Sequence, residues 1–331
     1  MERFNWKNKK VLVTGAGGFI GSHLVEYLTG LGADVRAMVH YNSLGRWGWL
    51  EGLKLRRHIK VIAGDVTDRD SVHTAVRGRD VIFHLAALIG IPYSYEAISS
   101  YVQTNIMGTL NILQAAREAA CECIITTSTS ETYGTAQYAP IDEKHPAAAQ
   151  SPYAATKAGA DQLAVSFHKS FGLPVKIARP FNTYGPRQSA RAIIPTIIIQ
   201  ILSGAKEIKL GNLLPTRDLT YVKDTVRGLV AIAQSKELFG ETVNIGSNSE
   251  IPIKDLCGLI ASLMDKKVKI IEDRARVRPE YSEVQRLLCD NTKLKSATGW
   301  DAQYDLRSGL RETIAWFKKN QTLYKSGIYG I

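Results

Sequence analysis

Three glycines near the start of the chain constrain its fold more than any other feature. In the segment TGAGGFIGS, Gly15, Gly18 and Gly21 are spaced three residues apart, after the apolar run KKVLVTG and before a helix expected at about 19–29. Glycines at this spacing let the backbone turn tightly and approach a pyrophosphate, whose charge the start of a helix favours. The segment predicts a dinucleotide-binding turn, with a tight turn that holds no ligand as the alternative.

Strand and helix patterns alternate up to about residue 181. Five further apolar runs are typical of buried strands: DVRAMVH, HIKVIAGD, DVIFHLAAL, ECIITTSTS and LPVKIARP. Helical periodicity follows in NIMGTLNILQAAREA, and a second helix should begin at Ser151-Pro152 and end at Gly172. Such alternation indicates an α/β protein with a Rossmann-type, doubly wound parallel sheet.

The alternation breaks after about residue 182. The loops NTYGPRQ and GNLLPTRD flank an isoleucine-rich helix expected at 193–202. We therefore predict an NAD(P)-binding Rossmann domain over 1–181 and a smaller, C-terminal substrate-binding lobe over most of 182–331. Chain at about 216–247 should return to the first domain, with TVNIGS as a strand of the main sheet.

Composition narrows the class of protein. The net charge is +11, but the basic residues are scattered apart from KLRRHIK and RARVRP, which favours a soluble basic enzyme over a nucleic-acid-binding protein. No apolar run is long enough for a membrane span, and MERFNWKNKK lacks the apolar core of a secretory signal. The four cysteines fit neither a zinc site nor a disulfide framework, so we expect no metal and a reducing, cytoplasmic setting. They are Cys121, Cys123, Cys257 and Cys289.

The loop after the second strand bears on which nicotinamide cofactor binds. An NAD site normally has an acidic residue about 20 residues after the glycines, but no acid lies between Asp34 and Glu51. Asp65, after the third strand, could hydrogen-bond the adenine amino group beside Val66, or could start the next helix. Polar residues of the loop could surround a 2′-phosphate, which favours NADP, with NAD as the alternative. They are His40, Asn42, Ser43 and Arg46.

Two short segments together contain side chains that are suited to proton transfer. Tyr153 and Lys157 are four residues apart and so share one helix face. A lysine near a phenol lowers its pKa, and the phenolate can take a hydroxyl proton as hydride leaves the same carbon. Upstream, STSETYG ends a strand with Thr129, Ser130 and Glu131, where a carboxylate is costly unless it is paired, solvated or used. We predict that the two segments form one active site.

The motifs taken together resemble a known family. TGAGGFIG, FHLAA, the helix with Asn105, STSETYG, SPYAATK, ARPFNTYGPRQ and TRDLTYVKD occur in the order typical of extended short-chain dehydrogenases/reductases. The chain is most similar to nucleotide-sugar 4,6-dehydratases, and STSETYG with ARPFNTYGPRQSARAIIPTII resembles the N-acetylhexosamine dehydratases of legionaminic-acid-type pathways. The dehydratase resemblance depends mainly on Glu131, because epimerases of the superfamily usually carry small residues there.

The resemblance implies conversion of UDP- or GDP-N-acetylglucosamine, or a related nucleotide hexose, to a 4-keto-6-deoxy sugar. Tyr153 and the cofactor would oxidise C4, with Thr129 near its oxygen, and Glu131 would remove the C5 proton. Water would then leave C6, and hydride would return there, regenerating a tightly bound cofactor in each turnover. Many dTDP-glucose dehydratases have an Asp where this chain has Ser130, as in the GDP-mannose branch, so Glu131 alone or with a water would complete the proton relay.

The resemblance also implies binding residues. His84 should be a packed strand residue, Asn105 should brace the site, and Tyr133 and Tyr184 should pack beside the sugar. Substrate contacts would include arginines suited to phosphate, with Arg187 as a weaker candidate. The implied substrate residues are Ser130, Asn182, Arg191, Arg217 and Arg278. The implied cofactor residues are Gly15, Gly18, Phe19, Ile20, Gly21, His40, Asn42, Ser43, Arg46, Asp65, Val66, Leu85, Ala86, Ala87, Thr127, Tyr153 and Lys157.

Two rival hypotheses stay open. A nucleotide-sugar 4-epimerase on the same fold would use Tyr153 and the cofactor but not Glu131. A non-catalytic dinucleotide-binding module would need none of the proton-transfer residues. By the same resemblance, we expect a homodimer joined through a four-helix bundle of the 100–119 and 152–171 helices.

Overall fold

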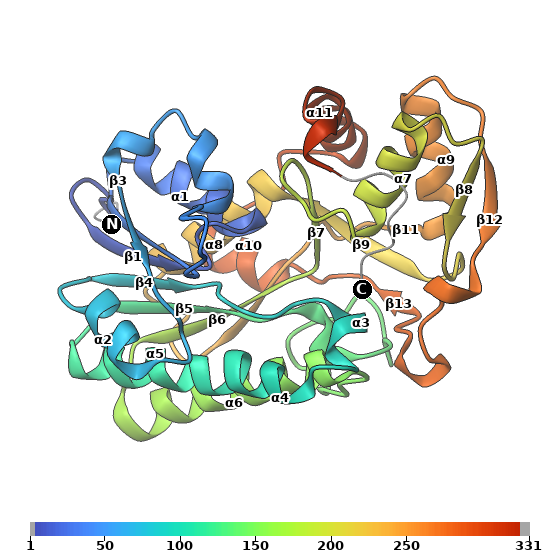
Figure 1. Cartoon of the computed structure of the whole chain (residues 1–331). Coiled ribbons are helices and arrows are strands. Elements are labelled where there is room, and N and C mark those ends of the chain that lie inside the picture. The colour runs from blue at the N-terminus through green and yellow to red at the C-terminus, as the bar shows by residue number, and fades with distance from the viewer. Residues whose placement is uncertain (1–3, 325–331) are drawn as a thin grey trace.

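A seven-stranded parallel sheet forms the centre of the protein, whose computed structural model describes residues 4–324 (Figure 1). The strand order is β10-β6-β5-β4-β1-β2-β3, and every neighbouring pair is parallel. The order reverses between β1 and β4, which is where doubly wound sheets bind ligands. The strands are β1 Lys10–Thr14, β2 Asp34–Val39, β3 Ile59–Ala63, β4 Val81–His84, β5 Cys123–Thr127, β6 Val175–Pro180 and β10 Thr242–Ile245.

Helices cover both faces of this sheet, because its strands carry apolar side chains on both faces. Val11 and Val13 belong to one buried apolar cluster and Leu12 to another, because successive side chains of a strand point to opposite faces. The helices α1 Phe19–Gly30 and α8 Val222–Gln234 lie on one face. On the other face lie α2 Arg69–Val76, α5 Gly108–Glu118 and α6 Pro152–Phe171 (Figure 1). The predicted α/β doubly wound fold is confirmed.

The ends of α6 follow the predicted capping chemistry. Ser151 precedes the helix and accepts a hydrogen bond from the Ala154 N–H, and Pro152 occupies its first position. Gly172 ends the helix in the left-handed conformation, with φ of 65°. The helix expected at 100–119 differs, because α4 Ile98–Tyr101 and α5 are joined by a π-helical turn over Val102–Met107.

The C-terminal lobe has its own small sheets and helices (Figure 1). The strand after residue 215, β9, pairs within this lobe. By contrast, α8 packs against the main sheet, and β10 joins that sheet beside β6, as expected for TVNIGS. The strands of the lobe are β7 Asn182–Tyr184, β8 Glu207–Leu210, β9 Thr216–Tyr221, β11 Glu250–Pro252, β12 Lys269–Glu272 and β13 Arg286–Leu287. The remaining helices are α3 Ile91–Ser94, α7 Ile193–Leu202, α9 Ile253–Leu263, α10 Thr292–Thr298 and α11 Leu306–Lys319.

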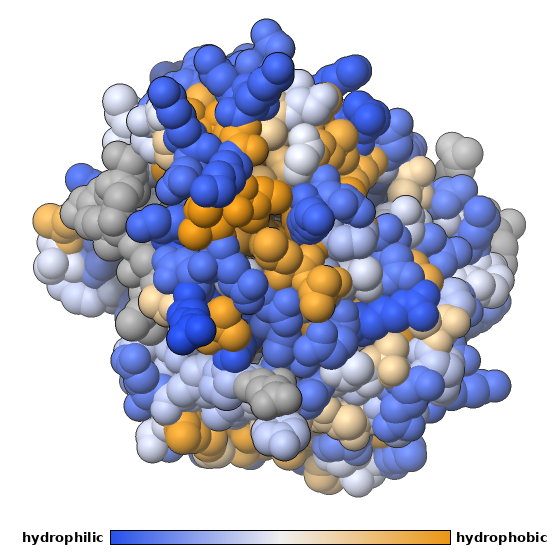
Figure 2. Space-filling view, turned by 90° about the vertical axis from the view of Figure 1, so that its right-hand side faces the viewer, coloured by the Kyte–Doolittle hydropathy of each residue, from blue (hydrophilic) through white to orange (hydrophobic). Residues whose placement is uncertain are grey.

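The lobe end of the molecule is apolar at its centre. Figure 2 shows hydrophobic side chains gathered in a band across this face, with hydrophilic side chains around them. Within the described residues, no helix is long and apolar enough to cross a membrane.

Candidate active site

The glycine turn lies at the reversal point of the sheet, between β1 and α1. Gly15 is left-handed, with φ of +65°, and a Cβ there would lie 2.8 Å from the backbone nitrogen of Ala86. A Cβ on Gly21 would lie 2.2 Å from the carbonyl oxygen of Gly15, so both positions exclude any side chain. Gly18 precedes α1, and no side chain caps that helix among the described residues. The first-turn N–H groups of α1 are thus free to bind an anion.

Thr14 fastens the glycine turn to the end of β4. Its hydroxyl oxygen accepts hydrogen bonds from the backbone N–H groups of Leu85 (3.2 Å) and Ala86 (3.1 Å). Two of the three residues predicted as cofactor contacts after β4, Leu85 and Ala86, are therefore held directly against Gly15. This arrangement brings the predicted cofactor residues of two strands to one place.

His84 is a neutral packing residue, as expected. Its Nδ1 lies 2.8 Å from the Thr14 hydroxyl, and its Nε2 lies 3.2 Å from the hydroxyl of Thr109. Because Thr109 donates its only proton to the carbonyl oxygen of Asn105, His84 must donate from Nε2 and accept at Nδ1. Burial, with the charge of Lys157, lowers the pKa of His84 to about 3. The ring is thus no candidate for a base at neutral pH.

The loop after β2 is folded back onto the glycine turn. Asn42 closes the loop with both ends of its amide, accepting from the Arg46 N–H and donating to the Arg46 carbonyl. Gly48 is left-handed and approaches Gly17 so closely that a Cβ would lie 2.4 Å from the Gly17 oxygen. The Trp49 N–H donates to that same oxygen at 3.0 Å. The amide of Asn42 is therefore occupied within the loop, while the loop itself lies beside the turn.

His40 and Asp65 face each other across the ends of β2 and β3. The distance from His40 Nδ1 to Asp65 Oδ2 is 3.7 Å, and both side chains are largely exposed. Asp65 also accepts from the N–H and hydroxyl of Thr67. The cap of α2 is Asp68, not Asp65, so the alternative of Asp65 as the helix start is wrong.

The structure brings together the two segments that are predicted to be catalytic. Thr129 ends the strand region after β5, and its hydroxyl accepts from the Glu131 N–H at 3.3 Å, which starts a short 3-10 turn. Thr129 also hydrogen-bonds the phenol of Tyr153, near the start of α6. Glu131, Tyr153 and Lys157 are all buried, with 8%, 8% and 4% exposed. A carboxylate, a hydroxyl and a phenol thus meet beside a lysine.

Burial is the largest influence on the pKa values of Tyr153 and Lys157. Burial raises the pKa of Tyr153, and the nearby charge of Glu131 raises it further, while the hydrogen bond with Thr129 lowers it. Burial lowers the pKa of Lys157, against the charge of Asp161. Burial thus outweighs every other influence on the pKa of Tyr153, and the expected lowering of that pKa by Lys157 stays a prediction.

Asn105 braces the site as predicted. It lies in the π-helical turn 102–107, a kind of irregularity that is frequent at functional sites. Its amide accepts from the Leu88 N–H (2.9 Å) and donates to the Leu88 carbonyl (3.0 Å) and to the hydroxyl of Thr156 (3.0 Å). Thr156 in turn donates to the carbonyl of Tyr153. The loop after β4 and the start of α6 are thereby joined.

A buried ion pair next to the predicted catalytic residues was not predicted from the sequence. Asp161 accepts from Ser128 and from Arg179, and the Arg179 guanidinium lies over the ring of Tyr133. Tyr133 is fully buried, and Tyr184 is buried with its hydroxyl bound to a backbone carbonyl, so neither ring packs beside a sugar. The expected sugar contacts of these two tyrosines are wrong.

Two predicted phosphate-binding arginines share one carboxylate. Arg217, which is 7% exposed, donates to Glu283 at 3.0 Å, and Arg278 Nη1 lies 3.7 Å from the same oxygen of Glu283. Burial lowers the pKa of Arg217, and the charge of Glu131 is the main influence that raises it. Arg217 therefore lies near Glu131. Sequence reasoning missed Glu283, whose position three residues after the tripeptide RPE gave no indication of this contact.

The other two arginines differ in their surroundings. Arg187 donates to Glu26 (2.8 Å) and to Ser22, so it is tied to α1. Arg191 Nη1 lies near Gly90, and its charge lowers the pKa of Tyr101, although burial raises that pKa overall. Arg191 therefore faces the loop after β4, whereas the guanidinium of Arg187 is bound to Glu26 and Ser22 of α1.

Two further hydrogen bonds join the lobe to the first domain, at Tyr281 and Ser282. The Tyr95 hydroxyl lies 2.6 Å from the Ser282 hydroxyl, and the Gln150 amide donates to the Tyr281 carbonyl at 3.0 Å. We call these the cross-lobe contacts. They hold the segment between Arg278 and Glu283, and with it the arginine cluster, next to the first domain.

Two buried oxygens in this region have no hydrogen-bond partner among the described residues. They are Thr127 Oγ1, at the end of β5, and Asn182 Oδ1, at the start of β7. Buried polar atoms are normally satisfied, so such orphans suggest bound groups. Together with the glycine turn that no Cβ could enter, they fit a dinucleotide and a polar substrate.

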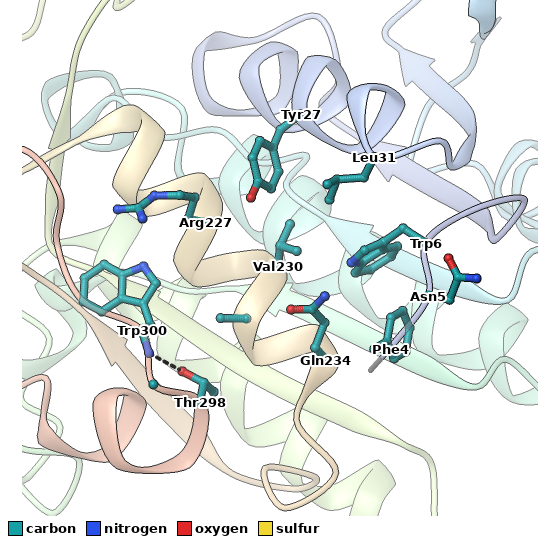
Figure 3. A pocket seen from close by; sticks show the side chains of 12 residues that line it. Phe4, Asn5, Trp6, Tyr27, Leu31, Arg227, Val230, Gln234, Thr298 and Trp300 are labelled. Carbon is teal, nitrogen blue, oxygen red and sulfur yellow. Dashed lines mark hydrogen bonds between the residues drawn. The ribbon is translucent and has the colours of Figure 1, made fainter. Parts of the chain in front are cut away.

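A cavity of about 430 Å³ lies elsewhere, as Figure 3 shows. Tyr27 and Leu31 line it from the end of α1 opposite the glycine turn, with Trp6 and Trp300 nearby. None of its lining residues is a predicted site residue. The candidate active site is therefore at the reversal point of the sheet, where the predicted site residues lie, and not in this cavity.

Comparison with known proteins agrees with this geometry. The family model described as GDP-mannose 4,6 dehydratase matches residues 12–313. The chain belongs to the GDP-mannose 4,6-dehydratase family. The resemblance to extended short-chain dehydrogenases/reductases of the nucleotide-sugar 4,6-dehydratase type is thus confirmed.

Members and structural neighbours of this family cover almost the whole chain. A dTDP-glucose 4,6-dehydratase of Streptomyces griseus is 32% identical over 322 residues, 95% of this chain and 96% of its own. DesIV, a dTDP-glucose 4,6-dehydratase from Streptomyces venezuelae solved with NAD bound, has a TM-score of 0.85 at 29% identity, covering 95% and 98% of the two chains. A UDP-N-acetylglucosamine 4-epimerase from Methanobrevibacter ruminantium M1 has a TM-score of 0.85 at 30% identity, covering 95% and 99%. The fold of this dehydratase family is therefore shared with epimerases.

Proposed function

We propose that this protein is an NAD(P)-dependent nucleotide-sugar 4,6-dehydratase. One observation carries the proposal: Glu131 is buried beside Thr129 and Tyr153 instead of extending from a solvated loop. A buried carboxylate is costly unless it is used or paired. Family membership and the dehydratase relatives support the same reaction.

The cofactor would lie across the glycine turn with its pyrophosphate at the start of α1. When bound, the nicotinamide supplies the reversible two-electron acceptor that the reaction requires. Tyr153 would take the proton of the C4 hydroxyl, and Thr129 would hold the phenol in place. Because burial raises the pKa of Tyr153, its phenol must first release its own proton to solvent, and the Lys157 ammonium on the same helix face would stabilise the phenolate that then acts as the base.

Glu131 would act on the two remaining protons. A C4 ketone acidifies the C5 proton, which a carboxylate can remove as general base. Ser130 is buried and stands where an acidic residue could have protonated the departing C6 hydroxyl. We therefore propose that Glu131 passes the C5 proton, directly or through a water, to the departing C6 hydroxyl, which leaves as water. C5 of the product would then take a new proton from solvent.

We propose NADP as the preferred cofactor. The support is that no acidic residue follows β2, where His40 stands instead, and that Ser43 and Arg46 belong to the loop whose later residues Trp47 and Gly48 lie against the glycine turn. The Asn42 amide contributes less than expected, because Arg46 backbone groups occupy it. Fluorescence titration with NADPH and NADH tests this: Arg46→Ala should weaken NADPH binding more than NADH binding, and equal losses would exclude it.

The substrate proposed is UDP- or GDP-N-acetylglucosamine, or a related nucleotide hexose. Its diphosphate would lie against Arg217 and Arg278, which converge on Glu283 near the catalytic segment. A guanidinium pair suits this task because it can make charge-assisted bonds to phosphate oxygens. Asn182, with its unpartnered buried oxygen, would bind the same substrate.

A direct assay tests the proposed function. The purified protein is incubated with UDP- and GDP-N-acetylglucosamine and with dTDP-glucose, and products are followed by mass spectrometry and proton NMR. Loss of one water from a substrate supports the dehydratase and identifies the nucleotide. An unchanged mass with inversion at C4 would establish a 4-epimerase, the second candidate, which the structural similarity to the Methanobrevibacter enzyme favours. Tight cofactor binding without any turnover would indicate the non-catalytic module.

We also propose a homodimer through the outer face of α4, the π-helical turn and α6. Large apolar side chains are exposed there: Ile98 (51%), Val102 (37%) and Met107 (39%). Light scattering should give twice the chain mass, and Val102→Glu should reduce the measured mass to that of one chain.

The cytoplasmic setting stays a prediction, consistent with four buried cysteines that are free thiols.

A further inference from the structure

We propose that Asp161 is a positioning residue that holds the two halves of the active site together. Tyr153, Lys157 and Asp161 follow one another at four-residue steps along α6, so they lie on one face of the helix. All three are buried, with 8%, 4% and 4% exposed. Tyr153 and Lys157 have proposed roles in the reaction, whereas no role has yet been proposed for Asp161.

Asp161 makes contacts with two strands. Its Oδ2 accepts a hydrogen bond from the Ser128 hydroxyl at 2.6 Å and another from Arg179 Nη2 at 2.7 Å. Ser128 follows β5 and directly precedes Thr129, while Arg179 belongs to the neighbouring strand β6. One carboxylate oxygen therefore connects the helix that carries Tyr153 to the strand end that carries Thr129.

The same ion pair also reaches the far end of the catalytic turn. The Arg179 guanidinium lies 4.5 Å from the centroid of the Tyr133 ring, and the Tyr133 hydroxyl donates to Asn244 Oδ1 at 2.8 Å. Tyr133 ends the 3-10 turn that contains Glu131. The turn is thus held at both ends, directly at Ser128 and through Arg179 at Tyr133. A displacement of Glu131 by about 1 Å would be expected to cost a large part of the rate.

Asp161 also sets the charge next to Lys157. Burial lowers the pKa of Lys157, and the negative charge of Asp161 acts in the opposite direction. The pKa of Tyr153 is raised mainly by burial, and Asp161 adds to that increase. Arg179, on the other side, pairs with the same carboxylate. Removing the charge of Asp161 should lower both pKa values together. The other titratable groups around the catalytic pair are His84 from β4, Tyr101 from α4 and Glu131 from the 3-10 turn.

Two variants separate the mechanical from the electrostatic contribution of Asp161. Ser128→Ala removes one hydrogen bond and keeps the charge, so it should lower kcat about tenfold without moving the pH profile. Asp161→Asn keeps an acceptor for Ser128 but removes the charge, so it should lower kcat and move both limbs of the profile to lower pH by about one unit. Asp161→Glu should restore part of the loss. Asp255→Asn, exposed on α9, is the matched control and should behave as wild type.

The inference rests on the proposed function, and cofactor binding separates the two. NADH fluorescence titrations across the same pH range need no sugar, and Asp161→Asn should lose affinity at a lower pH than wild type. Wild-type pH profiles and NADH affinity in folded Asp161→Asn would overturn the inference. If circular dichroism shows that Asp161→Asn does not fold, unchanged kcat in both Ser128→Ala and Asp161→Glu would overturn it instead. A wild-type protein that turns over no sugar nucleotide would defeat the proposed function, and the NADH titrations would still decide the role of Asp161.

Discussion

The close approach of Gly48 to Gly17 gives a quantitative test of how the cofactor loop is held. Gly48 has φ of +62°, and a Cβ would lie 2.4 Å from the Gly17 oxygen, whereas ordinary contacts begin at 3.4 Å. In Gly48→Ala the two segments must therefore separate by 3.4 − 2.4 = 1.0 Å. That movement would break the hydrogen bond from the Trp49 N–H to the Gly17 oxygen, now 3.0 Å long.

Two other glycines of the same loop supply matched controls. Gly45 is also left-handed, with φ of +60°, but nothing lies within 4 Å of the position that a Cβ would take there, so Gly45→Ala carries the backbone cost alone. Gly52 has neither a positive φ nor a close neighbour, so Gly52→Ala should be neutral or slightly stabilising.

The expected magnitudes follow from these geometries. The left-handed conformation costs alanine about 1–2 kcal/mol, part of which is offset by the smaller entropy of its unfolded chain. Gly48→Ala should lose about 1 kcal/mol more than Gly45→Ala, because it also breaks the hydrogen bond to Gly17. It should weaken NADH binding about tenfold, which corresponds to about 1.4 kcal/mol, since the glycine turn must shift.

Urea unfolding and NADH fluorescence titration measure both quantities for the three variants. Equal unfolding free energies and equal NADH affinities for Gly48→Ala and Gly45→Ala would refute the reasoning. The packing of the loop against the turn would then have no energetic consequence.

Two further predictions concern pH and substrate capture. The free energy of unfolding should fall by about 2 kcal/mol between pH 7 and pH 5 on account of His84, because its folded-state pKa of about 3 lies below the unfolded value of 6.5 and the unfolded chain binds the extra proton. Urea titrations should show a smaller loss for His84→Gln, and an equal loss would contradict this assignment. Tyr95→Phe should raise KM for the nucleotide sugar about fivefold with little change in kcat, because it removes one cross-lobe contact worth about 1 kcal/mol. Tyr138→Phe loses an exposed hydrogen bond to Asp142 and serves as the control; similar KM values in the two variants would exclude a role for the cross-lobe contact.

Local patterns account for the parts of the fold that were predictable. The isoleucine-rich helix was expected at 193–202, where α7 lies, and the Ser151-Pro152 pair and Gly172 mark the ends of α6. Capping, glycine conformation and apolar periodicity each depend on a few neighbouring residues, so one sequence suffices to see them. The glycine turn was predictable for the same reason, because it too depends on a few neighbouring residues.

What could not be predicted depends on contacts between distant segments. The partners of Asp161 are 33 residues before it and 18 residues after it, and the pairing of β5 with β6 places them side by side. The shared contact of Arg217 and Arg278 with Glu283 likewise needs the folded lobe. The rise in the pKa of Tyr153 could not be predicted for the same reason, because burial cannot be judged from a four-residue spacing to Lys157.

The role of Glu131 is the central claim, and solvent deuterium tests it most directly. Wild-type protein and Glu131→Gln are incubated in heavy water with the nucleotide sugar that the wild type turns over, and the product is examined by mass spectrometry and proton NMR. We predict a wild-type product that lacks one water and carries solvent deuterium, and a loss of at least about a hundredfold in that rate for Glu131→Gln. Water loss at the wild-type rate in Glu131→Gln, or an intact sugar inverted at C4 from both proteins, would contradict the account.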